Sequence, residues 1–195
     1  NPGCEGLWLE NHGLFSFADT AEASYELMIE FATLAEQELS RAGVTLEGPQ
    51  TSDQEADSAF VERLTAALTR AGSPFAKGLS LDYRSTPAIR RHVSKPEVED
   101  IALRGTVTPD HVIRIKPFPL ILDAGASEAD IDKALAGYIE RYTAYFERNA
   151  AKAAEPKTML DAYPRVVLVR GEGMFGLGNN AKAAKIAGDL IEQST

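Results

Sequence analysis

The sequence is organised around the stretch Leu7-Trp8-Leu9-Glu10-Asn11-His12-Gly13-Leu14-Phe15-Ser16-Phe17. It holds two apolar runs, each of strand length, separated by the polar step Asn11-His12-Gly13. Glycine tolerates the backbone conformations that a tight turn requires. We therefore predict a β-hairpin that places the His12 imidazole where its two strands meet.

A long helix is predicted directly after this hairpin. Asp19 and Glu22 have the spacing of an N-terminal capping box, and apolar residues recur at helical spacing as far as Leu39. Gly43 ends the pattern. Several glutamates share another side of this helix, which indicates either a solvated face or a face covered by a neighbouring chain.

The run from Leu9 to Leu39 resembles the class II aldolase/adducin superfamily. Its members carry Asn-His-Gly between two apolar strands, followed by Asp-Thr and a long Glu-rich helix. In the catalytic members this histidine is the third ligand of a divalent metal, usually zinc, and the resemblance implies that role for His12. From the residues alone, a hydrogen-bonded loop histidine remains the alternative.

Composition predicts a globular protein. Of its 195 residues, 44% are hydrophobic and 25% charged, which is ordinary for a folded domain. No apolar run approaches the roughly 20 residues that span a bilayer, so we expect no membrane segment. The single cysteine, Cys4, cannot form an internal disulfide, which favours the cytoplasm. The chain begins with Asn1, and we expect it to be a piece of a longer protein.

Charge is distributed unevenly. The net charge is −9, yet residues 1–60 hold 12 acidic residues and one basic residue, a difference of −11. This acidic portion would repel phosphates, so a nucleic-acid partner is not expected. The asymmetry favours two units of different origin, 1–47 and 53–195, joined by a linker that contains Gly48-Pro49.

The second unit alternates helical and extended patterns, which predicts an α/β fold, a small three-layer, Rossmann-like region. His111 stands at the mouth of a predicted strand and is interpreted as a structural, hydrogen-bonded residue. The predicted helices cover 52–71 with Ser52 as N-cap, short turns opening at Pro87 and Pro96, 127–149 and 180–192; the predicted strands cover 78–84, 112–115, 118–122 and 165–170.

A glycine-rich segment follows the last predicted strand. Gly171-x-Gly173-x-x-Gly176 matches the dinucleotide fingerprint, and we expect the segment to form a loop into the final helix. Its glycines, including Gly178, together with Arg114, form a candidate anion-binding site at a helix start. NAD is not expected to bind this segment tightly, because no second strand follows to carry the ribose-binding acid.

The segments 104–114 and 164–178 resemble a narrower group, the bifunctional rhamnulose-phosphate aldolase/lactaldehyde dehydrogenase proteins. The resemblance implies that 1–47 is the C-terminal part of a class II aldolase-like domain and that 53–195 connects it to a short-chain dehydrogenase domain. In the intact enzyme it implies zinc, NAD and a phosphorylated sugar substrate. The chain alone is expected to be inactive and to form a homo-oligomer. The alternative is a non-catalytic, adducin-like binding or assembly module.

Overall fold

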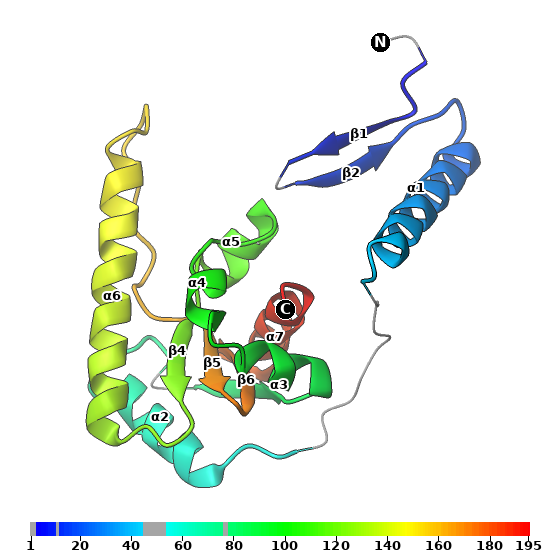
Figure 1. Cartoon of the computed structure of the whole chain (residues 1–195). Helices are drawn as coiled ribbons and strands as arrows, with labels where there is room; N and C mark the ends of the chain where they lie inside the picture. The colour runs from blue at the N-terminus through cyan, green and yellow to red at the C-terminus, as the bar shows by residue number, and fades with distance from the viewer. Residues whose placement is uncertain (1–2, 11, 45–53, 76–77) are drawn as a thin grey trace. The chain divides into compact units, whose positions relative to one another are not determined.

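The computed structural model describes residues 3–10, 12–44, 54–75 and 78–195 (Figure 1). They form two compact units. Unit 1 comprises Asn1–Pro49 and Val107–Pro109, and unit 2 comprises Gln50–Thr106 and Asp110–Thr195. None of the described helices is both long and apolar enough to cross a membrane.

Unit 1 is a hairpin followed by one helix. Strands β1 (Gly6–Leu9) and β2 (Gly13–Ser16) pair antiparallel, as predicted. Helix α1 (Ala21–Arg41) begins after Thr20, whose side chain accepts a hydrogen bond from the Ala23 N–H. The predicted cap at Asp19 is therefore wrong by one residue, because the threonine hydroxyl reaches the orphan donor instead.

Unit 2 is built on a four-stranded sheet with the order β3-β6-β5-β4. Its strands are β3 (Ser80–Arg84), β4 (Leu120–Asp123), β5 (Val166–Arg170) and β6 (Gly173–Gly178). β4 pairs with β5 in parallel, whereas β6 runs antiparallel to both of its neighbours. The sheet is therefore mixed, and the Rossmann-like expectation is not confirmed, because that architecture needs parallel pairing throughout its core.

Helices lie on both faces of this sheet (Figure 1). Most of the predicted helices are confirmed, with two differences. The second helix is capped by Asp57 rather than by Ser52, which lies outside the described residues. Residues 112–115 are helical, and His111 is buried in that helix rather than at a strand. The helices are α2 (Ser58–Arg70), α3 (Pro87–Val93), α4 (Val98–Ala102), α5 (Pro109–Ile115), α6 (Glu128–Ala150) and α7 (Ala181–Gln193).

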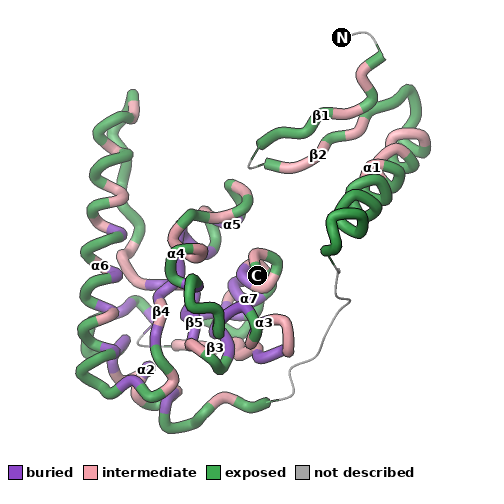
Figure 2. The backbone as a smooth tube through the Cα atoms, viewed as in Figure 1, coloured by how far each residue is buried: buried purple, intermediate pink, exposed green. Residues whose placement is uncertain are grey.

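The two faces of the sheet carry two separate apolar clusters. Side chains alternate along β5, so that Val167 and Val169 face α2 and α6, whereas Val166 and Leu168 face α3, α5 and α7. This two-sided burial explains why β5 reads as a continuous apolar run. Figure 2 shows the buried residues gathered in and around the sheet, whereas the described residues of unit 1 include none that is buried.

Two predicted helix starts are confirmed in atomic detail. Ser127 accepts a hydrogen bond from the Asp130 N–H, and the Asp130 carboxylate accepts one from the Ser127 N–H, which completes a capping box at α6. Thr86 caps α3, and Pro87 occupies its first turn. β4 lies at an edge of the sheet, where prolines such as Pro117 and Pro119 before it are tolerated.

Candidate functional sites

His12 lies at the turn of the unit 1 hairpin. Its backbone N–H donates to the Leu9 carbonyl over 3.1 Å, and its ring stacks on Phe15 with the two centroids 5.9 Å apart. Gly13 has a φ of +125°, a conformation that favours glycine, which explains why glycine follows the histidine. The hairpin thus presents an exposed imidazole on a defined turn.

One imidazole does not make a metal site. Across the residues that the structure describes, no three His, Cys, Asp or Glu side chains lie close enough together to hold a metal ion. A catalytic zinc normally takes three protein ligands. The described residues therefore supply one candidate ligand, His12, and not a complete metal site.

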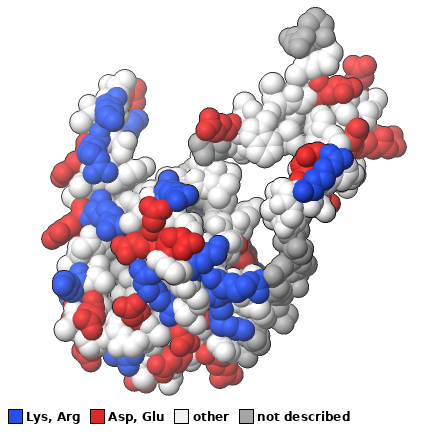
Figure 3. All heavy atoms as spheres, in the orientation of Figure 1, with Lys and Arg blue, Asp and Glu red and all other residues white. Residues whose placement is uncertain are grey.

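Large apolar side chains are also exposed around this hairpin. Trp8 on β1 is 74% exposed, and Tyr25 on α1 is 68% exposed. α1 buries none of its residues. In Figure 3 acidic atoms are prominent on unit 1, whereas both signs of charge are mixed over unit 2.

The glycine-rich segment is not the loop that its sequence predicts. β5 and β6 form a hairpin whose turn consists of Gly171 and Glu172, and residues 173–178 are the strand β6. β6 pairs on both sides, so its backbone groups serve the sheet ladder rather than a phosphate cradle. Among the glycines of 171–178, only Gly171 has a positive φ, 76°. The prediction that residues 171–178 form a dinucleotide-type loop is therefore wrong.

The glycines of β6 serve close packing instead. A Cβ atom built on Gly176 would lie 2.3 Å from the Ala184 carbonyl oxygen and 2.5 Å from the Gly188 nitrogen. One on Gly178 would lie 2.4 Å from the Ala184 nitrogen. Both contacts are with the backbone of α7, so glycine is needed for this helix to lie directly on the strand.

A cleft of about 390 Å³ opens beside the start of α7. It brings together two of the residues predicted for anion binding, Arg114 and Gly178, whereas Gly171, Gly173 and Gly176 do not line it. Arg165 and Lys182 add two further cations that the sequence reasoning missed. No carboxylate is found among the described residues that line the cleft: Phe75, Arg114, Arg165, Leu177, Gly178, Asn179, Asn180, Lys182, Ala183, Ile186 and Ala187.

Arg165 is fixed in place at the wall of this cleft. Its guanidinium donates to both oxygens of Asp161, with one of the two distances at 2.9 Å, and lies 4.6 Å from the centroid of the Phe75 ring. Burial works to raise the pKa of Asp161, but the hydrogen bonds and charge of Arg165 outweigh it and hold that pKa below its usual range. The carboxylate therefore stays ionised and offsets part of the charge of Arg165.

A second cation, Lys116, also contacts Asp161. The ammonium donates to the Asp161 backbone oxygen and lies 3.4 Å from its carboxylate. Burial, followed by the positive charge of Arg165, lowers the pKa of Lys116 to about 8. Lys116 thus belongs to the packed interior rather than to the cleft.

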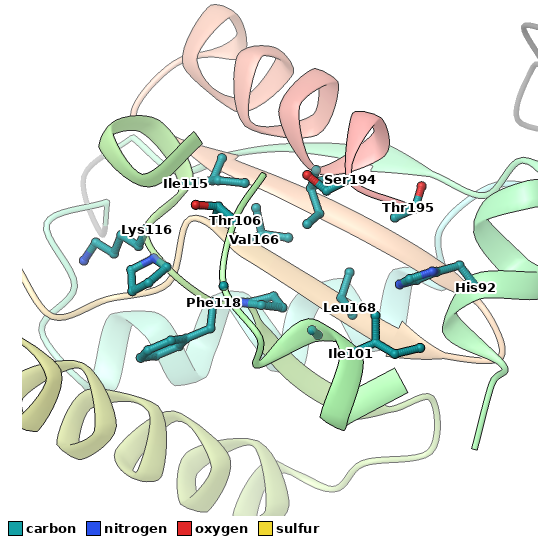
Figure 4. Close-up of a pocket in the computed structure, with 15 residues that line it drawn as sticks. His92, Ile101, Thr106, Ile115, Lys116, Phe118, Val166, Leu168, Ser194 and Thr195 are labelled. Carbon is teal, nitrogen blue, oxygen red and sulfur yellow. The ribbon is translucent and has the colours of Figure 1, made fainter. Parts of the chain in front are cut away.

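A smaller cavity of about 50 Å³ lies on the α7 face of the sheet (Figure 4). Figure 4 shows His92 at one end of this cavity and Ser194 and Thr195 at the end of α7 above it. The His92 Nδ1 is buried without a hydrogen-bond partner among the described residues. Burial, aided by the charge of Lys95, lowers the pKa of His92, which keeps the ring neutral near pH 7.

Unit 2 is an α/β fold with a mixed four-stranded sheet, and comparison with known families gives a match over these residues. The family described as "Aldolase class II, second domain" matches residues 55–195, and the chain belongs to this family. The matched segment covers most of unit 2. No solved structure matches the chain.

The chain is also similar to a curated bacterial protein. It is 24% identical over 210 residues to the "Uncharacterized oxidoreductase YuxG" of Bacillus subtilis (strain 168). The alignment covers 100% of this chain and 29% of that protein. The chain therefore spans less than a third of the length of this relative.

Proposed function

We propose that the chain is the central part of a two-function enzyme of sugar catabolism. One part would cleave a phosphorylated ketose of the rhamnulose 1-phosphate type by a metal-dependent aldol reaction. A short-chain dehydrogenase part would oxidise the released aldehyde with NAD. The observation that carries the proposal is the family match over residues 55–195, supported by the similarity to a much longer protein named as an oxidoreductase.

Unit 1 supplies the proposed link to the aldol reaction. The β1–β2 hairpin holds His12 on a turn whose glycine has a positive φ, with its ring exposed and stacked on Phe15. An imidazole in that setting can serve as one ligand of a divalent metal. The remaining ligands and the proton-transfer group would have to come from elsewhere in the intact protein, so the 195-residue chain alone is expected to be inactive.

The proposal is tested on the longest translated product that contains this chain. Cleavage of rhamnulose 1-phosphate is measured by an assay in which a coupling enzyme oxidises NADH as it consumes the dihydroxyacetone phosphate formed. Oxidation of lactaldehyde is measured separately, by the reduction of NAD. We expect both activities, and we expect His12→Ala to abolish the cleavage while leaving lactaldehyde oxidation intact.

The alternative makes the opposite prediction. A folded full-length protein that lacks both activities, with and without added divalent metal, would overturn the enzymatic proposal in favour of an adducin-like binding or assembly module. Cleavage activity that survives His12→Ala would overturn the role of His12 while leaving the reaction class standing.

A further inference from the structure

We infer that the cleft beside α7 is a binding site for the phosphate group of a small molecule. The inference concerns unit 2 alone and does not depend on the proposed aldol reaction. It begins from charge: the chain has 29 acidic and 20 basic residues, yet the described lining of this cleft has three basic side chains and no acidic one. Such a concentration of one sign in a concave surface attracts anions.

The three cations do not have equal freedom. Arg165 is held by Asp161 and by the Phe75 ring, so it forms a preorganised wall. Arg114 on α5 and Lys182 on α7 are exposed, and neither has an ion pair within the described parts of the chain. An anion that enters the cleft would therefore meet two cations that do not have to break an existing ion pair in order to bind it.

The backbone at the start of α7 adds to the positive potential of the cleft. The Asn180 side chain accepts a hydrogen bond from the Ala183 N–H over 2.9 Å, which caps α7 at the cleft. The first N–H groups of a helix have no partner within the helix, and the helix dipole places partial positive charge there. Gly178 lets this end of α7 lie close to β6, and Lys182 and Ala183 of its first turn line the cleft, so the start of the helix adds partial positive charge beside the cations.

The volume limits the ligand class. A cleft of about 390 Å³ falls within the range of small-molecule sites and exceeds the space that a single phosphate needs. Apolar side chains, Leu177, Ile186 and Ala187, line part of it, so the ligand would carry a phosphate on a small organic body. Sugar phosphates and nucleotides share this chemistry.

The test uses the full 195-residue chain and three probes: inorganic phosphate, glycerol 3-phosphate and ADP. Binding is measured by calorimetry at about 0.15 M salt, where non-specific surface binding is screened. Amide chemical shifts of Ala181, Lys182 and Ala183 report the location. We expect saturable binding of at least one phosphate ester, with a dissociation constant below about 1 mM, and shifts at these amides.

The variant and its control are matched in charge. Arg114→Gln with Lys182→Gln removes the two unpaired cations of the cleft and is expected to weaken binding at least tenfold, about 1.4 kcal/mol. Arg148→Gln with Lys152→Gln removes one arginine and one lysine from exposed positions elsewhere and is expected to change affinity less than about twofold. Both pairs lie on the surface, so folding should be preserved.

Three results would overturn the inference. The first is the lack of saturable binding of any probe up to about 10 mM. The second is an equal loss of affinity in the two double variants, which would mean that the protein's overall charge, not the cleft, binds the anion. The third is binding with shifts only at amides outside the cleft. Preference for glycerol 3-phosphate or ADP would identify the organic body as sugar-like or nucleotide-like.

Discussion

The Lys116 ammonium lies over the face of Tyr142, 4.1 Å from the ring centroid. The side chain of Lys116 is only 2% exposed, and its backbone adopts a φ of 66°, which is uncommon for a residue other than glycine. The charge is thus enclosed by an aromatic ring and by Asp161, at the connection from α5 into β4. A lysine so placed links the edge of the sheet to α6 and to the segment before β5.

Replacing this lysine tests the energetics of its burial. In Lys116→Met the stem is kept and Asp161 remains paired with Arg165. Because a buried charge costs desolvation energy, we expect the free energy of unfolding at pH 7 to change by less than about 2 kcal/mol, in either direction. Urea unfolding measures it. A loss of more than about 4 kcal/mol would show that the ammonium is strongly stabilising.

The same residue predicts a pH dependence. Its folded pKa of about 8 lies below the unfolded value of 10.5. Between these two values the unfolded chain holds more protons, so stability rises with pH from about 8 upwards. We expect this rise between about pH 8 and 9.5 in the wild type and its absence in Lys116→Met. A flat profile in both proteins would contradict the lowered pKa.

His92 predicts a second pH dependence, on the acid side. Its folded pKa is lowered below 6.5, so the neutral ring is favoured in the native state. Stability from this group is fully present above pH 6.5 and is lost as the pH falls below it, by about 1.4 kcal/mol for each unit of difference in pKa. His92→Leu should flatten the loss between pH 7 and 5.5. An equally steep loss in His92→Leu and in the wild type would contradict the lowered pKa of His92.

The packing of α7 on β6 is tested at Gly176. Gly176→Ala places a methyl group against the backbone of α7, and backbone cannot rotate away. We expect a loss of at least about 2 kcal/mol in the free energy of unfolding. The control is Gly137→Ala, whose Cβ would meet nothing within 4 Å on an exposed face of α6. There alanine should stabilise the helix by up to about 1 kcal/mol.

Unit 2 is expected to fold without unit 1. Both apolar clusters consist of residues beyond Gln54, and the described part of unit 1 buries no side chain. A chain of residues 54–195 should therefore unfold cooperatively, with a midpoint within about 5 °C of that of the full chain. Thermal unfolding followed by near-ultraviolet circular dichroism measures this. A broad transition or a missing near-ultraviolet signal would show that unit 1 completes the core.

The helices could largely be predicted because their signals are local. The capping box at Ser127 and Asp130 and the pair Thr86-Pro87 act within one turn, and the structure confirms both. The error at residues 112–115 is instructive. β-branched, apolar residues favoured a strand there, although Pro109 offered the same first-turn signal that Pro87 gave correctly.

The glycine-rich segment could not be predicted from local pattern. Alternation of glycine with larger residues is compatible with a phosphate loop, and also with a strand that another backbone approaches closely. The choice between loop and strand depends on the strand that pairs with β6. On one side that strand is β3, which is far away in the sequence. The same holds for the cleft: Arg114 and Gly178 were identified by residue type, but Arg165 and Lys182 join them only through the sheet and α7.

The order of strands in the sheet has a consequence for synthesis on the ribosome. β3 and β4 are made first, but they are the outer strands, and the inner pair, β5 and β6, is made last. Until residues 166–178 have emerged, neither outer strand has its native neighbour to pair with. In the nascent chain the four-stranded sheet therefore cannot form until this segment has emerged, whereas the preceding helices can already form from local contacts.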